Sequence, residues 1–150
     1  MNPPFWHLTL NHLPVEGMFV GTLLLLVSVW RRNEVLMRAS LLVLVVVAIT
    51  SVPVYLTGLK AEDTLMAQPE FMDQLSDSHH HAATFALVAT LLTGVLAIAA
   101  LIFFQKFRRL TCGVLALSIA SSILLGWTAH RGGLIQHPEI RPPDRADTHH

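Results

Sequence analysis

The sequence predicts an all-α integral membrane protein in which four transmembrane helices form an antiparallel up-and-down bundle. Apolar residues make up 53% of the 150 residues and charged residues 13%, whereas ordinary soluble domains carry about 25% charged residues. The mean hydropathy is +0.54. Four apolar stretches each approach the roughly 20 residues that a helix needs to cross a bilayer. Short connections between these stretches favour antiparallel neighbours.

The boundaries of the four spans follow from helix-capping signals and charges. Asn11 is placed to cap the first span, and Pro14 falls in its first turn, where a missing N–H costs little. Arg31 and Arg32 end that span. We expect one membrane domain over the whole chain, with a tail from Gly132 that does not continue the last helix. The predicted spans of this domain are at about 12–30, 37–59, 82–104 and 110–130. An extracytoplasmic loop is expected at 60–78 and an extracytoplasmic tail at 131–150.

The charges of the connections predict the orientation. Arginines join the first two spans and a second basic group joins the last two, whereas acidic residues outnumber the single lysine in the connection at 60–78. Lys and Arg concentrate on the cytoplasmic side of membrane proteins. We therefore expect a multi-pass protein of a bacterial inner membrane with both termini in the periplasm. The formal net charge of zero gives no indication of nucleic-acid binding.

Small residues at helical spacing predict how the helices pack. Gly17 and Gly21 form a GxxxG pair in the first span. In lipid, close backbone approach through small residues stabilises contacts between helices. A stripe at four-residue steps runs from Ser118 to Gly126 and continues to His130, so we expect His130 to face the protein rather than lipid. The comparable stripe in the third span consists of Ala86, Thr90 and Gly94.

Residues that can bind metals gather at the outer ends of the predicted spans. Nine histidines are present, and none lies on the predicted cytoplasmic connections. Imidazole is the commonest metal ligand, and His and carboxylate groups from several helices of a bundle bind iron, copper or haem. The single cysteine, Cys112, excludes an internal disulfide and a cysteine-based cluster. The candidate metal ligands are His12, Glu16, Glu62, His79, His80, His81, His130 and His137.

A haem b site with two histidine ligands requires that the two residues face each other at one depth. His12 opens the first span and His79 opens the third, and these spans can be diagonal in a four-helix bundle. We therefore expect His12 and His79 as axial ligands, with His130 or His137 as substitutes. Arg131 is placed to meet a haem propionate at the interface.

Less specific interpretations stay open for the same residues. Histidines at a membrane interface can simply be solvated. Glu16 can also be a shallow solvated carboxylate, although a carboxylate about one turn inside an apolar span is a functional candidate by default. Successive helical residues point about 100° apart, so His79, His80 and His81 cannot all face the core. We expect at least one of these three to be solvated.

Four short motifs occur in order along the chain. They are Asn11-His12-Leu13-Pro14-Val15 with Gly17, Tyr55-Leu56-Thr57-Gly58 followed by Ala61-Glu62-Asp63, His79 ahead of Ala82-Ala83, and Gly132-Gly133 followed by His137-Pro138-Glu139-Ile140. In these motifs the chain resembles a family of uncharacterised bacterial four-helix integral membrane proteins, described as a domain of unknown function, some of them suspected b-type cytochromes. The resemblance implies the fold and a shared site at His12, His79 and His137, but no established reaction. The family pattern has acidic residues after His79 and often an amide at the position of His130.

We predict a membrane protein that binds haem b or another redox metal at its outer face. It would transfer electrons between the membrane or a quinone and a periplasmic electron carrier, alone, as a homo-oligomer or with other membrane subunits. Two alternatives are a non-haem copper, zinc or iron site, which the carboxylates favour, and a cofactor-free accessory subunit. The sequence contains no nucleophile motif and no phosphate-binding loop, so whether the protein is an enzyme stays open.

Overall fold

A computed structural model describes residues 3–66, 73–103 and 107–137, and nearly all of these residues are helical. One short helix precedes four long ones. The helices are α1 (Pro3–Leu10), α2 (His12–Arg31), α3 (Glu34–Met66), α4 (Asp73–Ile102) and α5 (Phe107–Gln136). The all-α fold class expected from the composition is therefore confirmed.

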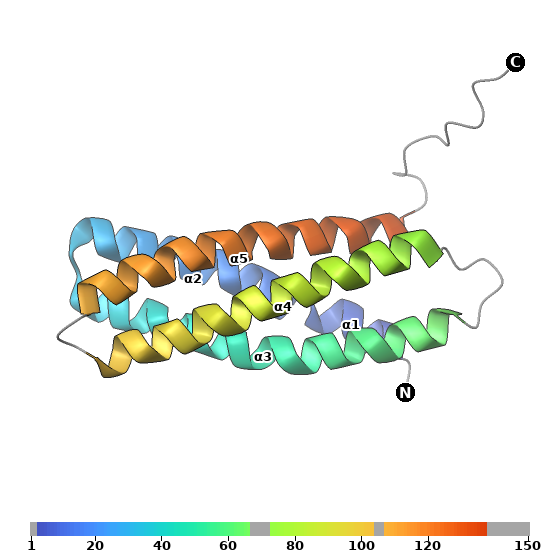
Figure 1. The fold of residues 1–150 in the computed structure, drawn as a ribbon, viewed down its shortest axis with the longest axis horizontal. Coiled ribbons are helices and arrows are strands. Elements are labelled where there is room, and N and C mark those ends of the chain that lie inside the picture. Colours follow the sequence, from blue (N-terminus) through green and yellow to red (C-terminus); the bar gives the residue numbers. More distant parts are fainter. Residues whose placement is uncertain (1–2, 67–72, 104–106, 138–150) are drawn as a thin grey trace, which may run out of the picture.

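The four long helices form an up-and-down bundle (Figure 1). Helix α3 packs between α2 and α4, and α5 packs between α4 and α2, so that α2 and α4 are diagonal. The short helix α1 packs mainly against α3. Four segments are long and apolar enough to cross a membrane, and they are Pro4–Arg31, Glu34–Thr64, Leu75–Ile102 and Arg109–Gln136.

The two ends of the bundle differ in charge and composition. At one end α2 turns into α3 through Arg32, which adopts the left-handed conformation, and Asn33, whose side chain accepts a hydrogen bond from the Leu36 N–H. The opposite end holds α1, the last turns of α3 and α5, and the first turns of α4 (Figure 1). We call it the histidine end, because all seven histidines of the described residues lie there.

Small residues form the contacts between helices, as the sequence predicts. A Cβ atom built on Gly17 would lie 2.7 Å from Val47 Cγ2, and one on Gly21 would lie 2.8 Å from Leu44 Cδ2. A Cβ on Gly94 would clash with Cβ of Ala48. The bundle interior also contains buried Ser and Thr side chains, whereas large apolar side chains cover the outside. An apolar outer surface is what lipid-facing helices require, and small polar residues between helices allow close packing.

Helix boundaries at the histidine end differ from the expected ones. Residues 3–10 form a helix, since Pro at a first helical position has its φ angle preset. The expected loop at 60–78 is largely helical, because α3 continues to Met66 and α4 begins at Asp73. Helix α5 runs through Gly132 and Gly133 to Gln136, contrary to the expectation that the helix stops there. Each glycine costs roughly 1 kcal/mol in a helix, and at Gly132 the helix lies directly against His79 of α4. The tail beyond residue 137 lies outside the described residues.

The expectation that His130 faces the protein is wrong. Ser118 and Ser122 are buried, but His130 is exposed. A step of four residues advances about 40° beyond a full turn of an α-helix, so three steps from Ser118 to His130 rotate the stripe by about 120°. The small residues thus face the bundle only over the first part of α5.

Candidate cofactor-binding site

A cavity of about 400 Å³ opens at the histidine end, and all five helices line it. Most of its lining is apolar, with Val15, Val54, Leu87 and Leu125 among the contributing side chains. The polar and titratable lining residues are His7, Asn11, His12, Ser51, Tyr55, Glu62, Ser76, His79, His80, Thr128, Gln136 and His137. The cavity therefore combines an apolar body with several imidazoles, as a cofactor pocket does.

One face of the first helical segment reaches the cavity. Its lining residues between Pro4 and Val15 recur at intervals of three or four, which places them on a single face. Helices α1 and α2 follow each other with Asn11 between them, and Asn11 itself keeps helical φ and ψ angles. His7 thus enters the cavity from α1, one helical turn ahead of Asn11.

His7 and His79 meet across this cavity. Their ring centroids are 6.5 Å apart and their ring planes make an angle of 77°. His7 Nδ1 lies 3.2 Å from the main-chain oxygen of Val54, and His79 Nδ1 lies 3.1 Å from the main-chain oxygen of Thr128. Two helices that are not neighbours in sequence, α3 and α5, therefore hold one imidazole each.

The two hydrogen bonds determine the tautomer of both rings. A carbonyl oxygen only accepts, so Nδ1 of each imidazole must carry the proton and donate it. In a neutral ring Nε2 then keeps its lone pair. Histidines that bind metals are usually held in this way, with one ring nitrogen on a carbonyl or carboxylate and the other on the metal. His7 and His79 both satisfy this requirement.

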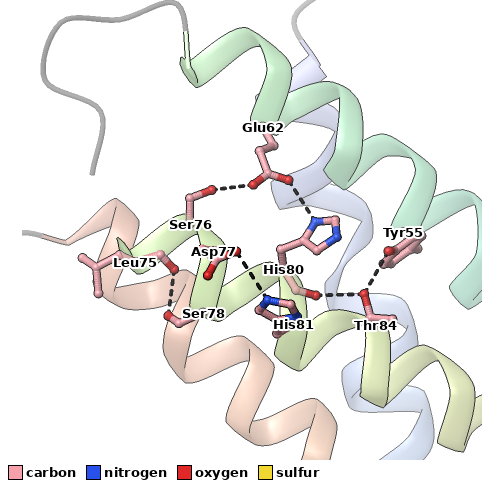
Figure 2. A network of polar contacts seen from close by, with 9 residues as sticks. All are labelled: Tyr55, Glu62, Leu75, Ser76, Asp77, Ser78, His80, His81 and Thr84. Atoms are coloured by element: carbon pink, nitrogen blue, oxygen red, sulfur yellow. Dashed lines mark hydrogen bonds and ion pairs between the residues drawn. The ribbon is translucent and has the colours of Figure 1, made fainter. Parts of the chain in front are cut away.

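A second polar group links α3 to α4 (Figure 2). Ser76 Oγ donates to one Glu62 carboxylate oxygen at 2.8 Å, and His80 Nδ1 lies 3.0 Å from the other. The Glu62 side chain is 19% exposed, so both of its oxygens are occupied in a partly desolvated position. Thr84 Oγ1 joins the main chain of His80 to the Tyr55 hydroxyl. This group fastens α4 to α3 beside the cavity.

The remaining predicted ligands lie at the edge of the cavity or outside it. His12 reaches its rim but is 69% exposed and pairs with Glu16, 3.5 Å away. His81 is 67% exposed and pairs with Asp77 on its own helix, so one of the three consecutive histidines is solvated, as expected. His137 lines the cavity, whereas Glu16, His81 and His130 do not.

Arg131, expected near a haem propionate, packs against its own helix. Its guanidinium carbon lies 4.7 Å from the centroid of the Trp127 ring. Its Nη1 also lies 3.4 Å from Ser78 Oγ on α4. Arg131 does not line the cavity.

Two residues of the site were not among the predicted candidates. His7 lies ahead of the predicted first span at about 12–30, outside the helix ends from which the candidate ligands come. Asn11, expected to cap a helix, makes no side-chain capping hydrogen bond and lines the cavity. Its buried Oδ1 has no hydrogen-bond partner among the described residues. The available signal was the three-to-four spacing of Pro4, His7, Asn11 and Pro14, which marks one helical face.

Among the described residues, the cavity holds two imidazoles that main-chain carbonyls fix in place. Within 3–66, 73–103 and 107–137, no three His, Cys, Asp or Glu side chains converge in a way that could hold an ion. Protein sites for zinc use three or four side-chain ligands. Haem iron takes four of its ligands from the porphyrin, so two imidazoles complete its coordination. His7 and His79 offer such a pair.

Comparisons with models of protein families, with curated proteins and with solved structures found no match for this chain. The geometry of the cavity is accordingly the basis for assigning a function.

Proposed function

We propose that this protein is a membrane-bound b-type cytochrome in which His7 and His79 bind haem and pass single electrons. Haem supplies one-electron chemistry, and the protein sets its potential through the axial ligands, their hydrogen bonds and the polarity of the pocket. His79 was expected as a ligand from the sequence. His7 takes the place that the sequence suggested for His12.

The observation that carries the proposal is the spacing of the two anchored imidazoles. Two imidazoles on opposite sides of one metal ion have ring centres about 6 Å apart, since each metal–nitrogen bond measures about 2 Å and each ring adds about 1 Å. The centroids of His7 and His79 are 6.5 Å apart. Both rings also have Nδ1 on a main-chain carbonyl, which leaves Nε2 for a metal.

The surroundings of the two rings support a porphyrin rather than water. The cavity of about 400 Å³ falls in the range of roughly 300–1,000 Å³ that is usual for cofactor sites, and its lining is mostly apolar. The amide of Asn11 supplies an unsatisfied polar atom at the cavity wall. A pocket whose lining is mostly apolar is the environment in which a haem ring is stably held.

The charge pattern supports an extracytoplasmic position for the site. Basic residues gather at the end of the bundle opposite the histidines, and Lys and Arg favour the cytoplasmic side. In our proposal the protein spans a bacterial inner membrane with the histidine end in the periplasm. Electrons would pass between a quinone of the membrane and a periplasmic carrier, with the chain acting alone, as a homo-oligomer or in a larger complex.

A non-haem metal site is the second candidate. The pair of Glu62 and His80 favours it, because both residues line the same cavity and haem requires no carboxylate. Copper, zinc or iron bound there would take Glu62 and His80 as its side-chain ligands. A cofactor-free accessory subunit is the third reading, which the solvated His12 and His81 support.

An oxidised-minus-reduced absorption spectrum of the detergent-purified protein, with metal analysis of the same sample, tests these candidates. A reducible Soret band and α-band at about one haem per chain are expected. Stoichiometric copper, zinc or iron without these bands would favour the second candidate. Protein that contains neither, after expression with haem and metals supplied, would refute both and favour the accessory subunit.

Substitutions identify the ligands. His7→Ala and His79→Ala are each expected to abolish the low-spin haem spectrum, because either change removes one axial ligand. His81→Ala is the matched control, since His81 lies next to the site in sequence but outside the cavity. A His7→Ala protein with an unchanged spectrum would remove His7 from the proposal.

A further inference from the structure

The two imidazoles are held by the same local arrangement on two different helices. His7 donates from Nδ1 to the carbonyl of Val54, and the residue one turn further along α3 is Gly58. His79 donates from Nδ1 to the carbonyl of Thr128, and the residue one turn further along α5 is Gly132. In both cases the carbonyl at position i accepts the bond and a glycine occupies position i+4.

Both glycines lie directly against the imidazoles. A Cβ atom built on Gly58 would lie 2.9 Å from Cε1 and 3.3 Å from Nδ1 of His7. A Cβ on Gly132 would lie 3.1 Å from Cε1 and 3.4 Å from Nδ1 of His79. The neighbouring glycine, Gly133, has no atom within 4 Å of its Cβ position. Of these three glycines, only Gly58 and Gly132, each four residues after an accepting carbonyl, lie close to a histidine ring.

Helix geometry explains why glycine is required at position i+4. The Cα–Cβ bond of a helical residue tilts toward the helix N-terminus, so a side chain at i+4 lies beside the carbonyl of residue i. Glycine leaves the side of the carbonyl next to position i+4 uncovered, and at Val54 the Thr57 hydroxyl donates to the same oxygen. An imidazole from another helix can then donate to an oxygen that already accepts the N–H of residue i+4.

We infer that Gly58 and Gly132 are positioning residues that hold the His7 and His79 rings with their planes 77° apart, for a haem with nearly perpendicular axial imidazoles. This inference rests on the proposed cytochrome function and adds the relative orientation of the ligands and its structural cause. The orientation is measurable. Nearly perpendicular imidazole planes give low-spin ferric haem an EPR signal with one dominant large g value, whereas parallel planes give three well-separated g values.

The first experiment compares three glycine variants of the haem-loaded protein. Gly58→Ala and Gly132→Ala are each expected to lower haem affinity by about 10- to 100-fold, the usual effect of disturbing groups that orient metal-binding histidines. Any haem that stays bound should lose the single dominant g value. Gly133→Ala is expected to retain both affinity and EPR signal. Wild-type protein that binds haem with a three-g-value spectrum, or three variants that behave alike, would overturn the inference while leaving the cytochrome proposal intact.

The second experiment uses protein without haem, so its outcome does not depend on the cytochrome proposal. Gly132→Ala is introduced into the natural chain and into a His79→Ala background. The denaturing-detergent concentration at the midpoint of unfolding is measured for each protein with and without the alanine at position 132. We expect the alanine to lower the midpoint when the His79 ring is present and to raise it when the ring is absent, because alanine favours a helix. The corresponding pair is Gly58→Ala with His7→Ala. Shifts of the same sign in both backgrounds would overturn the positioning role.

If the wild-type protein binds no haem but the shifts reverse sign as described, the cytochrome proposal fails and the glycines still position the rings. If haem binds and the signs do not reverse, the proposed function stands and the positioning role fails.

Discussion

His7 on α1 and His79 on α4 line the same cavity, and a main-chain carbonyl holds each ring. The sequence identified His79 but favoured His12 as its partner. His12 lies five positions after His7, which corresponds to about 140° around a helix. The helical face that places His7 inside therefore leaves His12 at the rim, where it is 69% exposed. The position of each residue around the helix therefore decides that His7, and not His12, lies inside the cavity.

Glu62 is expected to contribute to stability independently of any cofactor. Glu62→Ala removes the acceptor of both Ser76 and His80, and leaves the buried Ser76 hydroxyl without its partner. We expect a loss of about 1–3 kcal/mol in the free energy of unfolding. Titration with a denaturing detergent, followed by helical ellipticity, measures this loss.

The control for Glu62 is the exposed pair on α4. Asp77→Ala removes the carboxylate next to His81, with side chains 67% and 75% exposed, so the expected loss is about 0–0.5 kcal/mol. Equal losses for the two variants would mean that the bonds of Glu62 do not fasten α4 to α3.

Helix α1, which carries the proposed ligand His7, adds to a ring of four helices that is closed without it. The four long helices already pack as a closed ring, whereas α1 packs mainly against α3. A chain that starts with a new methionine before Asn11 is therefore expected to insert in the membrane and keep its helical content, but to bind no haem because it lacks His7. Ellipticity and the haem spectrum of the purified protein test this. Haem binding by the shortened chain would exclude His7 as a ligand.

The contact between α3 and α4 depends on Gly94. A methyl group there would clash with Cβ of Ala48, so Gly94→Ala must separate the two helices. We expect a loss of about 1–3 kcal/mol, typical of overpacking. Gly113→Ala is the matched control, because its Cβ would meet Leu96 Cδ2 at an ordinary 3.4 Å. Detergent-induced unfolding of both variants measures the difference, and a Gly94→Ala protein as stable as the control would contradict the packing described.

The long apolar helices and their order were predictable from the sequence, because lipid imposes both a length and a composition on them. The small-residue contacts of Gly17 and Gly21 were predictable for the same reason. The helix boundaries at the histidine end were not predictable from the sequence. The last turns of α3 and α5 and the whole of α1 are mixed in polarity, and packing against neighbouring helices decides their conformation. The cavity is built from these segments, which is why its lining was only partly foreseen.

The proposed orientation can be tested with single cysteines. The natural chain has one cysteine, Cys112, so a Cys112→Ser background leaves no other thiol in the sequence. In this background we place a cysteine at the exposed Glu34 or at the exposed Asp77, which lie at opposite ends of the bundle. A membrane-impermeant maleimide applied to spheroplasts is expected to label Asp77→Cys and to label Glu34→Cys only after permeabilisation. The reverse pattern would place the histidine end in the cytoplasm.

The lining of the cavity extends from Pro4, near the start of the chain, to His137, just after the last helix. Proteins enter the membrane from the N-terminus onward during synthesis. When α4 has been inserted, the Thr128 carbonyl that fixes the His79 ring has not yet left the ribosome. The pocket is therefore finished only after translation of α5, so the haem of the proposed cytochrome would enter a completed bundle. On that proposal, biogenesis of the protein would separate into two events, insertion of an empty chain followed by loading.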